Sequence, residues 1–257
     1  MSSSHEMLVF GAGQLGQLYA AGALRLGIRV WPLTRQMDAD QTMAAFPDGH
    51  PILLGVAEAS FADALRKIPD SRRQDVVLVQ NELFPAQLAE WGLDKATVLT
   101  VWLSKKKGRP IEVARTSSAY GRHAALFHRM HQALELPSTV LTSAEELHTD
   151  IAAKFTFILT INALGLVENL SLGQWLEKDH TQVSRLIDEA RALAQMHLQA
   201  NVDAAQTRQR VMEAMEGLHD YPAKGRSAKA RLSKALNDAA RFELDLPCLR
   251  QIANGQV

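Results

Sequence analysis

The hydrophobic positions of the chain follow one pattern up to about residue 143 and a different one after it. In the first part, short apolar runs of strand length alternate with helical stretches. Strands are expected at 7–10, 28–31, 51–56, 75–80, 97–103 and 139–141, and helices at 14–26, 60–68, 86–91 and 124–134. Buried strands that alternate with helices are typical of a parallel sheet with helical crossovers. Residues 110–114 and 117–120 are expected to form a hairpin at the sheet edge.

The strand pattern stops after about residue 143. Apolar residues then recur at three- and four-residue spacing over 144–178, 182–199, 202–217 and 227–242, which predicts helices throughout. The change of pattern places a domain boundary at 141–143. We therefore expect an α/β domain over 1–143 and an all-helical domain over 144–257.

The composition excludes several classes of protein. The chain has 257 residues, with 28 basic and 28 acidic side chains and a formal net charge of zero. Charge-driven nucleic-acid binding needs a basic excess, so no such partner is expected. Cys248 is the one cysteine, which rules out a disulfide framework and favours a reducing compartment. The first residues lack a signal-peptide pattern and no apolar run approaches the ~20 residues that span a bilayer, so we expect a cytoplasmic protein without a membrane partner.

A glycine-rich loop directly follows the first expected strand and opens the first expected helix. Its sequence is Gly11-Ala12-Gly13-Gln14-Leu15-Gly16. In a dinucleotide-binding loop the first glycine permits the tight turn, the second lets the backbone approach a pyrophosphate, and the third lets helix and strand pack closely. The helix N-terminus then attracts the phosphates. This context predicts a Rossmann-type, doubly wound parallel sheet that binds a nicotinamide dinucleotide; the alternative is a glycine turn without a ligand.

The end of the second expected strand favours NADP over NAD. An NAD-binding chain usually carries Asp or Glu there to hold the ribose hydroxyls. Here the strand continues into Thr34 and Arg35 without an acid. Arg35 can pair with a 2′-phosphate and Thr34 can assist, whereas Asp38 is expected inside the next helix. The alternative for Arg35 is an ordinary solvated arginine.

An N-terminal Rossmann domain followed by a helical domain resembles the ketopantoate reductase family. The opening loop matches at Gly11, Gly13 and Gly16, and an arginine eight residues after a glycine matches at Arg35. Residues 77–82 resemble the family's strand that ends in an asparagine, at Asn81. The 154–169 helix and the 220–247 stretch resemble the two motifs of its helical domain.

The resemblance implies an NADPH-dependent oxidoreductase that reduces a 2-keto acid or similar carbonyl to a hydroxy acid. It implies a substrate and dimerisation domain similar to the C-terminal domain of 6-phosphogluconate dehydrogenase, and thus a homodimer. The active site departs from the family. Ile158 stands where the catalytic lysine is expected, one turn before Asn162, and Ala228 stands where a substrate-anchoring glutamate is expected.

Other side chains can supply the missing chemistry. Reduction of a ketone needs a proton donor near the carbonyl oxygen, and Lys154 lies one turn before Ile158 on the same helix face. With Asn162 and Asn169 it forms a polar stripe on the expected helix. Alternatively, Lys154 is solvated and the asparagines join helices. Asn81, at the carboxyl end of a strand, can orient the nicotinamide or polarise a carbonyl, or is an ordinary turn residue.

The remaining polar clusters are interpreted as structural. His123, His128 and His131 share one expected helix, but no carboxylate completes a set of ligands, so no metal site is expected. Three functional hypotheses remain. The first is an NADPH-dependent reductase with an altered active site, and the second is a catalytically inactive NADP-binding sensor or interaction protein. A third is a chain with this fold that binds no nucleotide.

Overall fold

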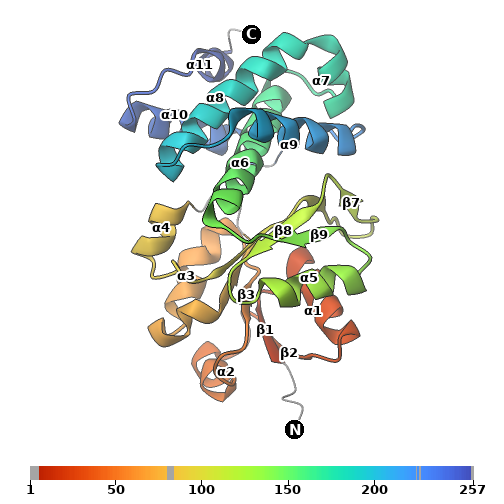
Figure 1. Cartoon of the computed structure of the whole chain (residues 1–257), viewed down its shortest axis with the longest axis vertical. Coiled ribbons are helices and arrows are strands. Elements are labelled where there is room, and N and C mark those ends of the chain that lie inside the picture. The colour runs from red at the N-terminus through yellow and green to blue at the C-terminus, as the bar shows by residue number, and fades with distance from the viewer. Residues whose placement is uncertain (1–5, 80–83, 224, 226, 256–257) are drawn as a thin grey trace. The chain divides into compact units, whose positions relative to one another are not determined.

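The computed structural model describes residues 6–79, 84–223, 225 and 227–255, and it divides into two units. The first unit contains residues up to Glu112 and Thr116–Ser143. The second contains Val113–Arg115 and the chain from Ala144 onward. The first is an α/β unit and the second is helical (Figure 1). The predicted fold class, a Rossmann-type sheet followed by a helical domain, is confirmed.

The strands described in the structure belong to the α/β unit, except that Val113 of β7 falls in the second unit. They are β1 (Glu6–Phe10), β2 (Arg29–Leu33), β3 (Ile52–Leu54), β4 (Val76–Leu78), β5 (Thr97–Thr100), β6 (Leu103–Ser104), β7 (Glu112–Val113), β8 (Ser117–Tyr120) and β9 (Ser138–Val140). Its helices are α1 (Gln14–Arg25), α2 (Ala39–Ala45), α3 (Phe61–Arg66), α4 (Pro85–Glu90) and α5 (Ala124–Ala133), with short 3-10 helices at Glu58–Ser60 and Asp70–Asp75.

Seven strands form one sheet in the order β2-β1-β3-β4-β5-β8-β9. All neighbours are parallel except β5 and β8, which pair antiparallel with Leu99 opposite Ala119. From β1 the chain goes to β2 on one side and then to β3 on the other. The topological switch point therefore lies between β1 and β3, and ligands of such sheets bind beyond the carboxyl ends of the strands at that point.

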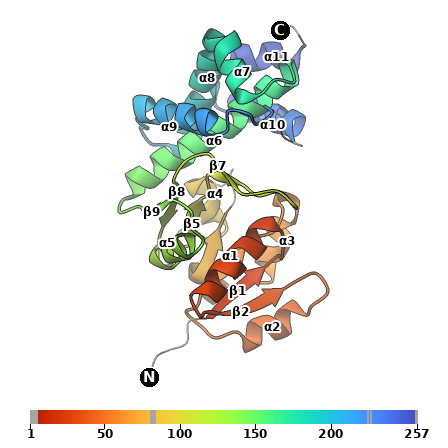
Figure 2. The ribbon, with the colours of Figure 1, turned by 90° about the vertical axis from the view of Figure 1, so that its right-hand side faces the viewer.

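Alternate residues of the central strands face two helical layers. Met7 and Val9 belong to the core cluster that also contains Tyr19 of α1 and Phe127 of α5. Helices α1 and α5 accordingly lie side by side on one face of the sheet (Figures 1 and 2). Successive side chains of a strand point to opposite faces, so the fully buried Leu8 packs on the other side.

Two sequence predictions about the sheet are wrong. The 110–114 and 117–120 segments do not form a hairpin, because β7 pairs with β6 in a separate two-stranded sheet and β8 lies inside the main sheet. The backbone N–H of Trp102 donates to the Ser117 hydroxyl at 2.9 Å, which ties the start of β8 to the main sheet. The third strand also ends at Leu54, so Gly55 and Val56 belong to the following loop.

The helical unit is built around one long helix. Its helices are α6 (Ala144–Val167), α7 (Leu172–Lys178), α8 (His180–Leu198), α9 (Ala204–Gly217), α10 (Ala228–Arg241) and α11 (Pro247–Ala253). Helices α8, α9 and α10 all pack on α6 (Figure 2). Buried residues occur all round α6, among them Ala152, Ala153 and Leu164. A helix that is apolar all round is a core helix or a membrane span.

No apolar run long enough to span a bilayer was expected, but helix α6 has that length and composition. By length and composition it could cross a membrane, since an 18-residue window has a mean hydropathy of 1.5. However, 78% of that window is buried within the protein, as in the core helix of a helical domain.

Residues Val113–Arg115 pack on the helical unit beside the end of α9. A Cβ added to Gly217 would overlap the Ala114 carbonyl oxygen, so only glycine allows this approach. The contact brings Arg115 to α6, where its guanidinium lies 2.9 Å from the Asp150 carboxylate.

Candidate functional site

The glycine loop 11–16 has the close packing that its first and third glycines predict. Gly11 adopts a φ of +99°, which favours glycine, and a Cβ there would approach the Gly55 carbonyl oxygen to 2.8 Å. A Cβ on Gly16 would overlap the Gly11 carbonyl oxygen. The Gly11 N–H donates to Leu33 O at 2.9 Å, which joins the loop to the end of β2. The protein's own packing therefore requires glycine at positions 11 and 16.

Gly13 differs from these two glycines. It is exposed, and an added Cβ would meet only the Gly55 carbonyl oxygen, at an ordinary 3.6 Å. Its φ is −71°, which any residue can adopt. Neither packing nor backbone conformation in this unit calls for glycine at this position. A glycine with an open outer side fits the close approach of a ligand's phosphates to the backbone.

The start of α1 adds an electrostatic reason for an anion at this place. Gly13 is the N-cap of α1, no side chain caps the helix, and its first turn contains no acid. The positive end of the helix dipole therefore meets no negative charge from its own first turn. The loop also lies at the switch point between β1 and β3. A dinucleotide's pyrophosphate fits this cradle.

The end of β2 presents the two residues that the sequence assigns to the cofactor. Thr34 is half-buried, and Arg35 is exposed in the turn before α2. Among the described residues, no ion pair involves Arg35. Asp38 is the N-cap of α2, where its carboxylate accepts from the Gln41 N–H at 3.0 Å, so it is not inside the helix as expected. A cationic side chain such as Arg35, just after β2, suits an anionic 2′-phosphate, whereas an acidic side chain there would repel it.

Asn81, predicted at the carboxyl end of β4, lies outside the described residues. β4 itself spans Val76–Leu78, and all three of its residues are buried. The predicted role of Asn81 stays a prediction.

Lys154 lies on α6, half-buried, with its ammonium 5.8 Å from the centre of the Phe157 ring. The pKa of Lys154 is lowered from 10.5 to about 8, with burial as the largest cause and the charges around it included in that value. Among these charges, Asp150 raises the pKa, and Arg115 and Arg231 lower it. Because an acid works best when its pKa is near the working pH, these surroundings suit a proton donor. Lys154 is not the solvated lysine of the alternative interpretation.

The rest of the predicted polar stripe is not continuous. Asn162 is buried and its Nδ2 donates to the Ile158 carbonyl oxygen at 2.7 Å, within its own helix. Its Oδ1 faces Gly225, where a Cβ would overlap it. Asn169 is exposed beyond the end of α6 at Val167, so the prediction that it shares a helix face with Lys154 is wrong. Ala228 begins α10 and is buried.

The histidines of α5 have structural partners. His131 is buried and hydrogen-bonds to the Tyr19 hydroxyl at 3.0 Å, and His128 hydrogen-bonds to Ser138 at 2.8 Å. His123 lies 3.8 Å from the buried Asp75 carboxylate, which also binds Arg122. Across the described ranges, no group of three or more His, Cys, Asp or Glu side chains could hold a metal ion.

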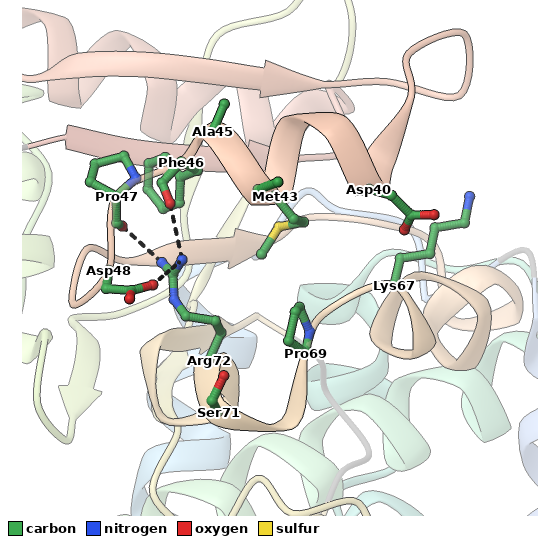
Figure 3. A pocket seen from close by; sticks show the side chains of 11 residues that line it. Asp40, Met43, Ala45, Phe46, Pro47, Asp48, Lys67, Pro69, Ser71 and Arg72 are labelled. Carbon is green, nitrogen blue, oxygen red and sulfur yellow. Dashed lines mark hydrogen bonds and ion pairs between the residues drawn. The ribbon is translucent and has the colours of Figure 1, made fainter.

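A pocket of about 500 Å³ lies between α2 and the 3-10 helix at Asp70–Asp75 (Figure 3). Arg72 lines it and binds the carbonyl oxygens of Phe46 and Pro47 and the carboxylate of Asp48. These residues precede β3 and β4, whereas the glycine loop follows β1. In a parallel sheet these are opposite ends of the strands, so this pocket is not part of the glycine-loop site.

Sequence reasoning missed two parts of the site. Gly55, which packs on Gly11, follows a buried run of Ile and Leu, and a glycine at the end of such a strand is the signal that was available. Asp150 and its partners were also missed. A lone acid amid the apolar positions of a long helix is a signal that it needs a cationic partner.

No model of a known protein family matches the sequence, and no curated protein sequence matches it significantly. Solved structures do match it over nearly the whole chain. D-mandelate dehydrogenase in complex with NADH is 14% identical, with a TM-score of 0.66 over 97% of this chain and 96% of that one. A ketopantoate reductase from Ralstonia eutropha is 15% identical, with a TM-score of 0.67 over 97% and 96%. A 2-dehydropantoate 2-reductase from Methylococcus capsulatus is 16% identical, with a TM-score of 0.68 over 97% and 94%.

Proposed function

From the fold that this chain shares with the ketopantoate reductases, we propose that it is an NADPH-dependent oxidoreductase that reduces a 2-keto acid or a similar carbonyl. In this proposal the first unit binds the nucleotide and the second holds the substrate. One observation carries it: the glycine loop forms a cradle at the switch point of the sheet, and Gly13 is open to the outside although packing does not require it to be glycine.

The chain's own residues divide the work in this proposal. Gly13 and the start of α1 hold the pyrophosphate, and Arg35, with Thr34, holds the 2′-phosphate. When bound, the reduced nicotinamide supplies a hydride to the carbonyl carbon. The Lys154 ammonium donates the proton to the carbonyl oxygen, because a pKa of about 8 leaves it largely protonated at neutral pH. Asn81 would orient the carbonyl. Asn162 would stabilise α6, the helix that carries Lys154, through its hydrogen bond to the Ile158 carbonyl oxygen.

A nucleotide titration followed by turnover assays tests the proposal. NADPH and NADH are titrated separately into the protein while the nucleotide's fluorescence is followed, and a panel of 2-keto acids is then added. We expect saturable NADPH binding, weaker NADH binding, and oxidation of NADPH by at least one keto acid. Absence of binding to either nucleotide would overturn both the reductase and the sensor interpretation.

A second candidate is an NADP-binding sensor or interaction protein without catalytic activity. It is favoured by Ile158 and Ala228, both apolar where the family resemblance implies a lysine and a glutamate. NADPH binding without turnover of any keto acid supports this candidate, whereas turnover that depends on Lys154 excludes it.

The proposal extends to assembly and location. A ketopantoate reductase from Staphylococcus aureus, 14% identical with a TM-score of 0.64, is described as dimeric. We propose a homodimer through the helical unit and a cytoplasmic location. Light scattering coupled to size-exclusion chromatography should give twice the 28.3 kDa of one chain; a monomer at all concentrations would contradict the dimer.

A further inference from the structure

The pocket between α2 and the 3-10 helix at Asp70–Asp75 has a buried cation in its wall. Its volume of about 500 Å³ is in the range of small-molecule sites. The side chain of Arg72 lines this pocket and is only 7% exposed. Arginine is rarely buried unless anions pair with it. The partners of Arg72 therefore decide which ligands the pocket can bind.

Buried groups hold the Arg72 guanidinium in place on its inner side. Its Nε donates to the Asp75 carboxylate at 3.0 Å, and the Asp75 side chain is 2% exposed. Its Nη1 and Nη2 donate to the carbonyl oxygens of Phe46 and Pro47 at 3.1 and 2.9 Å. The other oxygen of Asp75 lies 2.8 Å from Arg122 Nη1. One carboxylate thus serves two guanidinium groups, and a second anion balances their charge.

Asp48 supplies this second negative charge from the solvent side. Its Oδ1 lies 2.9 Å from Arg72 Nη1, but its side chain is 91% exposed. An ion pair with so exposed a partner contributes only about 0–1 kcal/mol. Figure 3 shows this pair at one end of the pocket, and Asp40 and Lys67 at the other end. The carboxylate of a ligand can therefore replace Asp48 at little cost, while the guanidinium stays in place.

The wall between these two ends suits an apolar ligand body. Met43 and Phe46 are buried, and Ala45, Pro47 and Pro69 also line the pocket. Figure 3 shows the Met43 side chain pointing from α2 toward Pro69. Ligand pockets usually combine such apolar walls with a few polar groups that fix the orientation of the ligand. The pocket therefore suits one carboxylate attached to an apolar body.

We propose that this pocket binds a small apolar monocarboxylate, whose carboxylate replaces Asp48 on Arg72 and whose body packs on Met43 and Pro69. Charge-assisted hydrogen bonds from the guanidinium hold the carboxylate. Asp48 is then an internal competitor that occupies the anion position when no ligand is bound. The pocket and the glycine loop lie at opposite ends of the strands, so the ligand and a nucleotide can bind together. The inference does not depend on the proposed reductase function.

Calorimetric titration of the full-length protein tests the proposal. The probe is 2-naphthoate, compared with 2-naphthamide, which has the same shape without the charge, and with acetate, which has the carboxylate without the apolar body. The variant Asp48→Ala removes the competing carboxylate from an exposed position, so folding should be unaffected. The matched control is Asp40→Ala, which removes the same charge from the other end of the same pocket (Figure 3).

We expect 2-naphthoate to bind at least tenfold more tightly than 2-naphthamide or acetate, because only it offers both the charge and the apolar body. Asp48→Ala should tighten 2-naphthoate binding at least fivefold and change 2-naphthamide binding less than twofold. Asp40→Ala should change 2-naphthoate binding less than twofold, and saturating NADPH should leave its Kd unchanged.

Three results would overturn the inference: no binding of 2-naphthoate by Asp48→Ala, equal effects of the two variants, or competition between 2-naphthoate and NADPH. Absence of NADPH binding would overturn the proposed reductase function alone, since the carboxylate site does not need the nucleotide.

Discussion

Two candidate regions, the glycine loop of the first unit and the surroundings of Lys154 in the second, are built on different principles. The loop consists of six consecutive residues whose function depends on backbone shape: where glycine is required, and where a phosphate can approach. The Lys154 surroundings consist of side chains from three separate segments, at residues 113–115, on α6 and on α10. Burial and the charges of Asp150, Arg115 and Arg231 together set the pKa of Lys154.

This difference explains what the sequence could reveal. The loop is local, so its spacing and position between strand and helix were sufficient to predict it. Gly55 was missed because its contact with Gly11 is made by segments more than forty residues apart. The partners of Lys154 were missed for the same reason, since Arg115 and Arg231 lie far from it in sequence.

The fold shows the same division. The alternation of strands and helices predicted the sheet, because each element's periodicity is local. The pairing of β8 with β5 was not predicted, because two adjacent short segments resemble a hairpin whenever their true partners are remote. Asn169 was misplaced because nothing in the spacing alone marked the end of α6 at Val167. Ser171 and Gln174 form a capping box that starts α7, and this signal was available.

Replacement of Lys154 has the largest expected effect, because it should lower the rate of the chemical step without changing nucleotide binding. We expect Lys154→Met to lower kcat about 10²- to 10⁴-fold, the usual contribution of a positioned proton donor, with the Kd for NADPH unchanged. Single-turnover kinetics and nucleotide titration measure the two quantities. Lys229→Gln serves as the control for a loss of charge. Unchanged turnover in Lys154→Met would show that another group supplies the proton.

The next largest effect distinguishes Gly16, where packing requires glycine, from Gly13, where it does not. Gly16→Ala forces a Cβ onto the Gly11 carbonyl oxygen and should lower the free energy of unfolding by about 3 kcal/mol. Gly13→Ala meets no such contact and should lower it by at most about 1 kcal/mol, the preference for glycine over alanine at an N-cap. Urea denaturation followed by circular dichroism measures both. Equal losses would contradict the view that Gly13 is free of packing demands.

In the proposed function, the preference for NADPH depends on one exposed arginine, Arg35. Arg35→Ala should weaken NADPH binding ten- to a hundredfold, because charge-assisted hydrogen bonds to the 2′-phosphate are lost. NADH lacks that phosphate and should bind nearly as before. Fluorescence titration with both nucleotides gives the ratio. If both affinities fall equally, Arg35 does not recognise the phosphate.

In the proposed function, the pH dependence of turnover follows the pKa of Lys154, which is about 8. The protonated form is the donor, so kcat/KM should be constant below that pH and fall up to tenfold per pH unit above it. An ordinary solvated lysine would keep activity to about pH 10. The profile is measured with saturating NADPH, and Arg231→Gln should shift the fall to higher pH because a neighbouring positive charge is removed.

The smallest effect concerns stability rather than the site. Burial lowers the pKa of His123 and His131 in the first unit and of His197 in the second. These groups bind fewer protons in the folded state than in the unfolded state, so stability falls as the pH drops through about 6.5. Each proton of difference contributes up to about 1.4 kcal/mol per pH unit. Replacing His131 by Gln should flatten the dependence of Tm on pH between 5 and 7; an unchanged slope would contradict a neutral buried His131.

The central claim is that the outer side of Gly13 is the place where a dinucleotide's phosphates approach the backbone. The most direct measurement compares the Kd for NADPH of the wild-type protein and of Gly13→Ala, after urea denaturation has shown that both are fully folded under the assay conditions. We expect the wild type to bind saturably and the variant to bind at least tenfold more weakly. Equal affinities, or no binding by the wild type, would contradict the claim.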